Sequence, residues 1–160
     1  MASAPLFDLS RLDLEAAPIA GPTELKALLR QRGTFEMLDG VLYQNAEEQI
    51  IVGYKDIRDD DWWVEDHIPG RPLFPGALMI EAGAQLCSYD YMVQEGGIGE
   101  RFLGFGGLNQ TRFRGVVEPG VRMYFIGKVH RVRKTMFTYF VQGFVEGKLV
   151  FEAEVIGVAF

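Results

Sequence analysis

Residues 77–93 read Ala-Leu-Met-Ile-Glu-Ala-Gly-Ala-Gln-Leu-Cys-Ser-Tyr-Asp-Tyr-Met-Val and contain no proline. A run of this length without a helix breaker predicts about four or five turns of α-helix. The side chains are apolar on nearly every face, and a helix of that kind has to be wrapped by other elements instead of resting on a surface. We therefore expect this helix to lie at the centre of the molecule.

Segments rich in Val, Ile, Phe and Tyr flank this helix and predict β-strands. These segments are residues 35–43, 49–57, 102–105, 111–117, 122–132, 136–145 and 148–158. Glu146-Gly147 between the last two is a two-residue hairpin signal. Together the elements predict an α+β fold in which an antiparallel sheet of five to seven strands curls around one long central helix.

The rest of the chain fits one domain with an N-terminal extension. A chain of 160 residues that is 48% hydrophobic can bury a core of its own, and we interpret residues 22–160 as a single domain. Pro22 in the first turn and Gly33 beyond the last predict a short amphipathic helix over residues 22–32. Residues 1–21 hold scattered apolar side chains and predict an arm that lies across the domain or a partner subunit.

Charge and cysteine content exclude several classes of protein. A net charge of −6 argues against a protein that coats nucleic acid. Cys87 is the only cysteine, so an intramolecular disulfide and the Cys/His cluster of a zinc site are excluded. The acidic run at residues 59–61 lacks spaced partners, and we interpret it as a solvated turn, not a metal site. With no apolar run of about 18 residues and no basic-led leader, we expect no membrane span and a cytoplasmic location.

Three polar side chains interrupt the apolar helix. Glu81, Gln85 and Ser88 are spaced i, i+4 and i+7 and therefore share one stripe. Burying an ionised carboxylate is costly unless it is paired, so Glu81 is a candidate functional residue. Glu81 could instead have a structural role, either hydrogen-bonded by backbone donors or directed at the interface of a dimer.

The long irregular loop of residues 58–76 carries a second candidate, His67. A histidine can take and return a proton near neutral pH, and Pro69 and Gly70 constrain the backbone that follows it. A solvated loop histidine is the simpler interpretation. The other histidine, His130, lies in a basic strand and is interpreted as a surface residue.

Gly76 is a third candidate, because it lies at the start of the predicted helix. The unpaired N–H groups and the positive end of the helix dipole converge there. Such a terminus can stabilise an oxyanion, although Pro75-Gly76 can also serve only to turn the chain. Histidine, carboxylate and helix terminus are the parts needed to eliminate water next to a carbonyl. This chemistry requires no cofactor.

Residues 67–85, His-Ile-Pro-Gly-Arg-Pro-Leu-Phe-Pro-Gly-Ala-Leu-Met-Ile-Glu-Ala-Gly-Ala-Gln, resemble the signature of the β-hydroxyacyl-acyl carrier protein dehydratases of fatty-acid synthesis. A weaker resemblance continues in residues 28–35 with Asp39, and in residues 112–114 with Pro119-Gly120. It implies the hotdog fold, a sheet wrapped around a long helix. Ile68 stands where the family usually has Phe, and Gly33-Thr34 stands where it commonly has Tyr-Pro.

The resemblance also implies roles for the candidate residues. His67 would remove the C2 proton of a 3-hydroxyacyl thioester, Glu81 would handle the departing hydroxyl, and Gly76 would donate its N–H to the thioester carbonyl. Two subunits of a homodimer, or of a dimer-based larger oligomer, would pair so that the histidine of one faces the acid of the other. The supporting residues would be Pro69, Gly70, Pro75 and Gln85.

A basic segment offers a docking site for an acidic acyl carrier protein that bears the phosphopantetheine thioester. Its basic residues outnumber its one acid, Glu118, by six: Arg112, Arg114, Arg122, Lys128, Arg131, Arg133 and Lys134. The same sequence pattern would also result if these basic side chains were simply exposed to solvent on one face of two strands. A hotdog acyl thioesterase and a non-catalytic subunit that binds acyl chains or carriers are the alternative functions.

Overall fold

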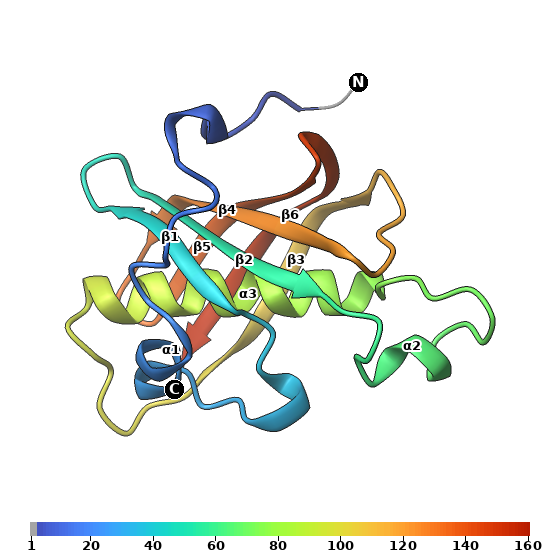
Figure 1. Cartoon of the computed structure of the whole chain (residues 1–160). Coiled ribbons are helices and arrows are strands. Elements are labelled where there is room, and N and C mark those ends of the chain that lie inside the picture. The colour runs from blue at the N-terminus through green and yellow to red at the C-terminus, as the bar shows by residue number, and fades with distance from the viewer. Residues whose placement is uncertain (1–2) are drawn as a thin grey trace.

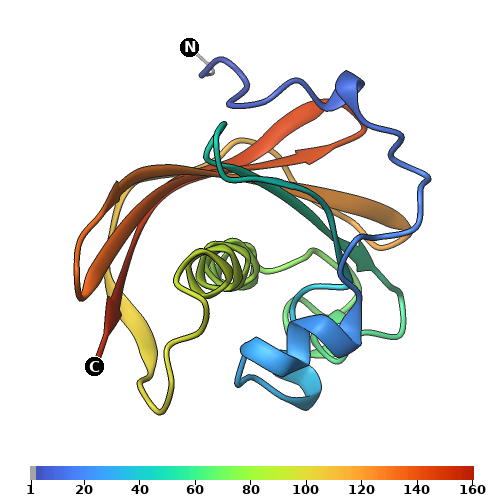
Figure 2. The same ribbon diagram turned by 90° about the vertical axis from the view of Figure 1, so that its left-hand side faces the viewer.

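The predicted central helix is present in the computed structural model, which describes residues 3–160. Helix α3 spans Gly76–Gln94, one residue longer at each end than predicted. Ala82, Leu86 and Cys87 are fully buried in it, because the sheet curls around its long axis (Figures 1 and 2). The apolar surface of α3 is thus covered as the sequence requires.

Six antiparallel strands form this sheet, which confirms the predicted α+β architecture. They run in the order β1-β2-β4-β5-β6-β3. Their bounds are β1 Gly40–Asn45, β2 Ile50–Ile57, β3 Leu103–Phe113, β4 Val121–Val132, β5 Met136–Val145 and β6 Lys148–Ala159. The predicted hairpin between β5 and β6 is confirmed, since Glu146 and Gly147 have φ values of 49° and 77°, as a type I′ turn requires.

The segment before β1 differs from the prediction. Helix α1 spans only Pro22–Leu28, because the Arg32 side chain turns back and donates to the backbone oxygens of Lys26 (2.9 Å) and Leu29 (2.7 Å), so that it caps the helix end. A 3₁₀ turn, η2, follows at Gly33–Phe35. The strand predicted from residue 35 therefore starts five residues later.

Strand β3 replaces two predicted strands. Residues 102–105 and 111–117 read as separate strands because glycines and polar residues lie between them. The structure continues the strand through these residues with two irregularities, at Phe105/Gly107 and at Asn109/Arg112, where Gln110 takes a φ of 48°. The gap in the sequence pattern thus encodes β-bulges and not a break. The strand ends at Phe113, so residues 114–117 lie outside it.

The loop before α3 is more ordered than predicted. It contains a short helix, α2, at Trp63–Asp66. The Trp63 side chain is 1% exposed and packs against Phe74, with 5.4 Å between ring centroids. Both side chains belong to the core cluster that includes Leu78 and Met79 of α3, so the loop is anchored in the core.

The N-terminal arm lies on the outer face of its own sheet (Figure 2). Residues 1 and 2 of the predicted arm are outside the described range. Phe7 is buried in an apolar cluster with Ile50, Val52, Ile126 and Phe144, beside a 3₁₀ turn, η1, at Leu9–Arg11. Further along, the arm pairs with β1 through an isolated bridge between Ala20 and Val41.

Candidate active site

His67 follows α2 directly and is exposed. Its ring Nδ1 lies 2.8 Å from the backbone oxygen of Leu73. A carbonyl oxygen only accepts hydrogen bonds, so Nδ1 carries the proton and Nε2 of the neutral ring keeps its lone pair. The side chain therefore presents a free base to its surroundings.

The sequence of the loop explains this arrangement. Pro69 fixes its own φ, and Gly70 takes a φ of 80°, which is unfavourable for other residues. The resulting turn is closed by a 3.0 Å hydrogen bond from Arg71 N–H to the Ile68 oxygen. The chain reverses here and returns the Leu73 carbonyl to the histidine ring.

Glu81 is half-buried and held by Gln85, one turn further along α3. The Gln85 amide nitrogen donates to Glu81 Oε1 and to the Phe35 backbone oxygen, both at 2.8 Å. Its amide oxygen accepts the Met37 N–H at 3.1 Å. Gln85 is only 2% exposed and is thus fully engaged, which fixes one oxygen of Glu81 and leaves the other free.

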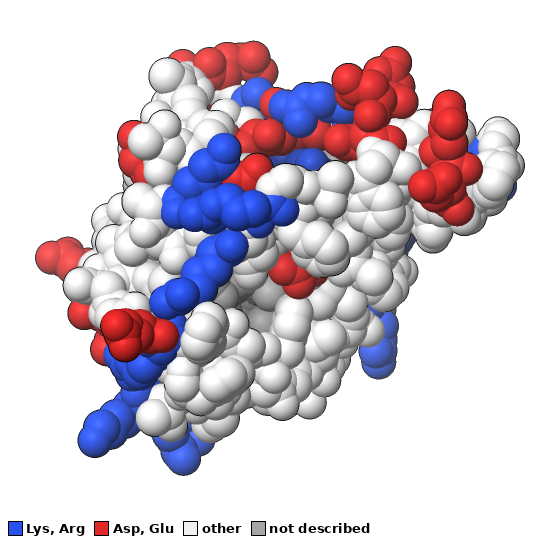
Figure 3. All heavy atoms as spheres, turned by 90° about the horizontal axis from the view of Figure 1, so that it is seen from below, with Lys and Arg blue, Asp and Glu red and all other residues white. Residues whose placement is uncertain are grey.

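The predicted stripe lines a small cavity between α3 and the strands β3 and β6. Glu81, Gln85 and Ser88 lie on its helix side, and Phe105 lies on its strand side. Seen from below, the surface has a hollow with an acidic group beside it and a row of basic groups to its left, and the surface to its right and below is largely uncharged (Figure 3). An apolar surface around a carboxylate suits an acyl chain better than a polar metabolite.

Gly76 is the first residue of α3, after Pro75 in extended conformation. A Cβ atom here would lie 2.8 Å from the Phe113 ring, so the close packing of β3 on this terminus requires glycine. Within residues 3–160, no backbone acceptor pairs with the Gly76 N–H. The donor is therefore available to a ligand.

One chain does not bring His67 and Glu81 together. Within the described residues no hydrogen bond joins them, and His67 is not on the wall of the Glu81 cavity. Glu81 and Gln85 are in contact, whereas the His67 ring bonds the Leu73 carbonyl of its own loop. A single subunit therefore carries the parts of a catalytic site without the assembled site.

The buried polar residue Asp90 was missed in the sequence, although it also interrupts the apolar helix. It is 3% exposed and accepts hydrogen bonds from the Tyr139 hydroxyl (2.6 Å) and the Gln44 amide (2.7 Å). Burial, and then the nearby Asp90 charge, raise the pKa of Tyr139 well above its ordinary value. Asp90 lies on a different face of α3 from Glu81. Its hydrogen bonds connect α3 to Gln44 of β1 and to Tyr139 of β5.

The seven basic residues of the predicted docking segment differ in their surroundings. Arg114 pairs with Glu152, and Arg122 pairs with Asp56, each at 2.6 Å. Arg131, Arg133 and Lys134 are exposed where β4 turns into β5 and have no ion pair within the described part of the chain. The remaining two differ, since Arg112 bonds its neighbour's carbonyl and Lys128 is half-buried.

Other predictions concern the surface. His130 is exposed as predicted, with its ring on Phe140 and its Nδ1 3.5 Å from a Glu154 oxygen. In the acidic run, Asp61 accepts the Arg58 N–H at 3.1 Å and so closes the turn. Among residues 3–160 no helix is long and apolar enough to cross a membrane, and no three His, Cys, Asp or Glu residues gather as a metal site would need.

The fold and the motif define a hotdog protein of the dehydratase class, and comparison with known proteins gives the family. The FabA-like domain model matches residues 29–154. The chain belongs to this family. It is 31% identical over 134 residues to the 3-hydroxyacyl-acyl-carrier-protein dehydratase FabZ of Campylobacter jejuni, an alignment that covers 82% of this chain and 91% of that protein.

Solved structures support the same fold. A chain of the dehydratase heterocomplex ApeI:P from Xenorhabdus doucetiae superposes with a TM-score of 0.71 at 10% identity, over 84% of this chain and 89% of that one. A mutant thioesterase from Staphylococcus aureus superposes with a TM-score of 0.60 at 12% identity, over 75% of this chain and 91% of that one. At such identities both likenesses concern the fold alone.

Proposed function

We propose that this protein dehydrates 3-hydroxyacyl-acyl carrier protein thioesters to trans-2-enoyl thioesters, in fatty-acid synthesis or a related pathway. Family membership and the FabZ relatives support this reaction. The observation that carries it is the free Nε2 of His67, a base held in one tautomer beside the helix that bears Glu81. The thioesterase alternative has only the fold in its favour.

His67 Nε2 takes the C2 proton, and the electrons of that C–H bond form the C2=C3 double bond. The Gly76 N–H donates to the thioester oxygen and stabilises the negative charge that develops there. Glu81 in its acid form protonates the C3 hydroxyl, which leaves as water. Gln85 orients Glu81 for this step. The imidazolium and the carboxylate then exchange the proton with solvent and return to their starting forms.

A homodimer completes the site. The two sheet edges are β1 and β3, and the arm already occupies part of the β1 edge through Ala20 and Val41. Strand β3 is left with unpaired backbone groups and with Phe105, Leu108 and Phe113 exposed. Such an edge is a template for a second copy. The Glu81 cavity borders this edge, so a partner joined here would bring its His67 loop toward Glu81.

The carrier protein docks on the unpaired cations at the turn from β4 to β5. Arg131, Arg133 and Lys134 are free to meet an acidic partner, whereas Arg114 and Arg122 would first have to leave their carboxylates. Replacing all three free residues by Ala should raise KM for the acyl carrier substrate and leave KM for a small thioester unchanged. Equal KM values for the variant and the wild type would remove this docking site.

The central experiment measures hydration of crotonyl thioester and dehydration of the 3-hydroxybutyryl form. His67→Ala should lower kcat by about 10²–10⁴-fold, as expected for loss of a general base. His130→Ala is the matched control, because it removes the other histidine, an exposed residue near the end of β4, and should leave kcat unchanged. Full activity in His67→Ala would refute the mechanism, and release of free thiol would identify a thioesterase instead.

A further inference from the structure

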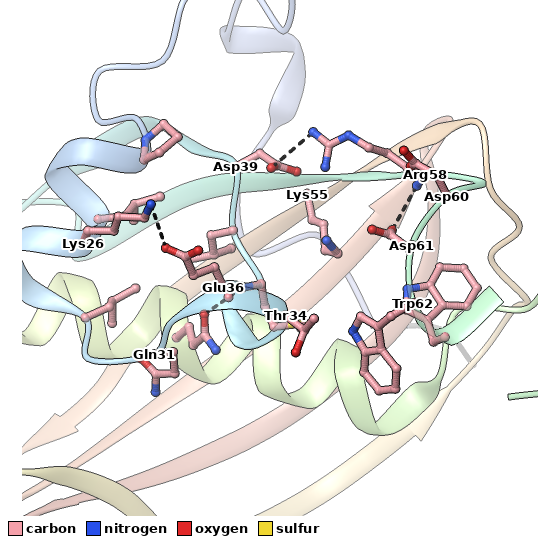
Figure 4. Close-up of a pocket in the computed structure, with 18 residues that line it drawn as sticks. Lys26, Gln31, Thr34, Glu36, Asp39, Lys55, Arg58, Asp60, Asp61 and Trp62 are labelled. Atoms are coloured by element: carbon pink, nitrogen blue, oxygen red, sulfur yellow. Dashed lines mark hydrogen bonds and ion pairs between the residues drawn. The ribbon is translucent and has the colours of Figure 1, made fainter. Parts of the chain in front are cut away.

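A cavity of about 460 Å³ between α1, η2, β2 and α2 is not explained by the proposed reaction (Figure 4). This volume is in the range of small-molecule sites. Gln85 separates it from the Glu81 cavity, because Gln85 lies on the wall of both. Neither His67 nor Glu81 lines it, so the proposed dehydration does not use this space.

Lys55 extends into this cavity from β2 (Figure 4). Strand alternation places it on the same face as Ile51 and Ile57, which are buried in the core around α3. A lysine in this phase breaks the pattern of the strand. Residues that break a local rule in this way mark functional sites more often than accidents.

Lys55 is also unpaired. The residue is only 6% exposed, and no hydrogen bond or ion pair within residues 3–160 reaches its ammonium group, which keeps some accessible surface because it faces the cavity. The indole N–H of Trp63, from the same lining, is buried and has no acceptor either. On the same wall, Gln31 Oε1 is a buried acceptor without a donor. Buried polar groups are normally satisfied, so these unpaired groups around the Lys55 ammonium indicate a ligand with a polar head group.

The other charged groups of the cavity lie at its rim, and all of them except Asp60 have a partner among the described residues. Asp39 pairs with Arg58, and Glu36 pairs with Lys26, both at 3.3 Å. Asp61 is bound to the Arg58 backbone, and Asp60 is exposed. Lys55 is therefore the one interior cation without a counterion in the described chain. The rim carboxylates would repel a dianionic phosphate more strongly than a singly charged anion.

The apolar part of the lining defines the rest of the ligand. Leu25, Leu29, Met37, Leu38 and Trp63 are all buried against this space. They offer an alkyl chain a surface away from water. We propose that the cavity is a second ligand site that binds a short- to medium-chain monocarboxylate, with the carboxylate on Lys55 and the alkyl chain against these side chains.

Intrinsic fluorescence provides a direct test, because the chain has two tryptophans and both line this cavity. Octanoate should change the tryptophan emission in a saturable way. Lys55→Met keeps the length and apolar stem of the side chain, so it should fold. It should weaken octanoate binding about tenfold or more and leave binding of neutral octanamide within about twofold. Lys55→Arg should retain octanoate binding.

Two controls locate the effect. Lys148→Met removes an exposed lysine of the β5–β6 hairpin and should bind octanoate like the wild type. Glu81→Gln should also bind normally, since Glu81 lines the other cavity. An unchanged octanoate affinity in Lys55→Met, loss of binding in Glu81→Gln, or no octanoate binding to the wild type would each overturn the proposal. The test measures binding alone, so its outcome does not depend on the dehydratase reaction.

Discussion

Gln85 shows how one residue couples the fold to the chemistry. It satisfies Met37 N–H and the Phe35 carbonyl, and it holds Glu81 at the same time. Gln85→Leu keeps a side chain of similar size but removes the amide, so the buried Met37 N–H and the part-buried Phe35 carbonyl lose their partners. We expect the free energy of unfolding to fall by about 2–4 kcal/mol in urea titrations, and kcat to fall by about 10–100-fold.

Gln94→Leu is the matched control for this prediction. Gln94 is an exposed residue of the same helix, and its amide reaches Asp90 only at 3.4 Å. This variant should unfold within about 0.5 kcal/mol of the wild type and turn over normally. If Gln85→Leu matched the wild type in both stability and kcat, the positioning role of Gln85 would be wrong.

Tyr139 gives the protein a dependence on alkaline pH. Its pKa is raised by burial and by Asp90, so the folded state keeps a proton that the unfolded chain loses above pH of about 10. The stabilising contribution is complete below that pH and is lost as the pH rises, by about 1.4 kcal/mol per pH unit. Tyr139→Phe should reduce this slope in urea unfolding between pH 9 and 11, and an unchanged slope would contradict the assignment.

Site residues could be predicted from the sequence only where a motif marked them. His67, Gly76 and Glu81 belong to a continuous stretch whose order carries the resemblance, whereas the partners of Gln85 come from a segment about fifty positions away that was expected to be a strand. Lys55 is visible in the sequence as a lysine in the buried phase of a strand. Recognising it as unpaired required the three-dimensional surroundings, since nearby acids are abundant in the sequence.

At the scale of elements, the arm is held on the sheet by the packing of Phe7 and by hydrogen bonds to Gln142 and Val41. Phe7 is 5% exposed, and Arg11 stacks on its ring at 4.6 Å while pairing with Glu48 at 2.8 Å. Phe7→Ala should lower the free energy of unfolding by about 2–4 kcal/mol and speed trypsin cleavage after Arg11. Ile19→Ala, at an exposed arm position, should change neither quantity; equal cleavage rates for wild type and Phe7→Ala would show that the arm is held by other contacts.

Elements with a strong period could be predicted closely, and elements with interrupted patterns could not. Helix α3 and strands β5 and β6 follow continuous patterns and lie within about one residue of the prediction. In β3, the residues that appear to interrupt the strand are bulges, which only pairing with β6 reveals. Helix α1 ends early because Arg32 returns to cap it, a tertiary arrangement that periodicity does not encode.

For the whole molecule, the separation of His67 from Glu81 within one chain makes the proposed dimer testable by mixing two inactive variants. His67→Ala and Glu81→Gln are each expected to be nearly inactive alone. If each site combines His67 of one subunit with Glu81 of the other, a mixed dimer has one site with both residues and one with neither. Random pairing puts half of the dimers in this mixed form, so co-expression should restore about a quarter of wild-type activity.

A site within one chain gives a different result, because every site in the mixed dimer would then lack one of the two residues. Co-expression would restore nothing, whatever the oligomer. Replacing Leu108 by Arg on the β3 edge adds a second constraint, since it places charges where the strands of two copies would meet. This change should dissociate the dimer in analytical ultracentrifugation and abolish the restored activity together with that of the wild type. A dimer that survives Leu108→Arg would place the subunit interface elsewhere than at β3.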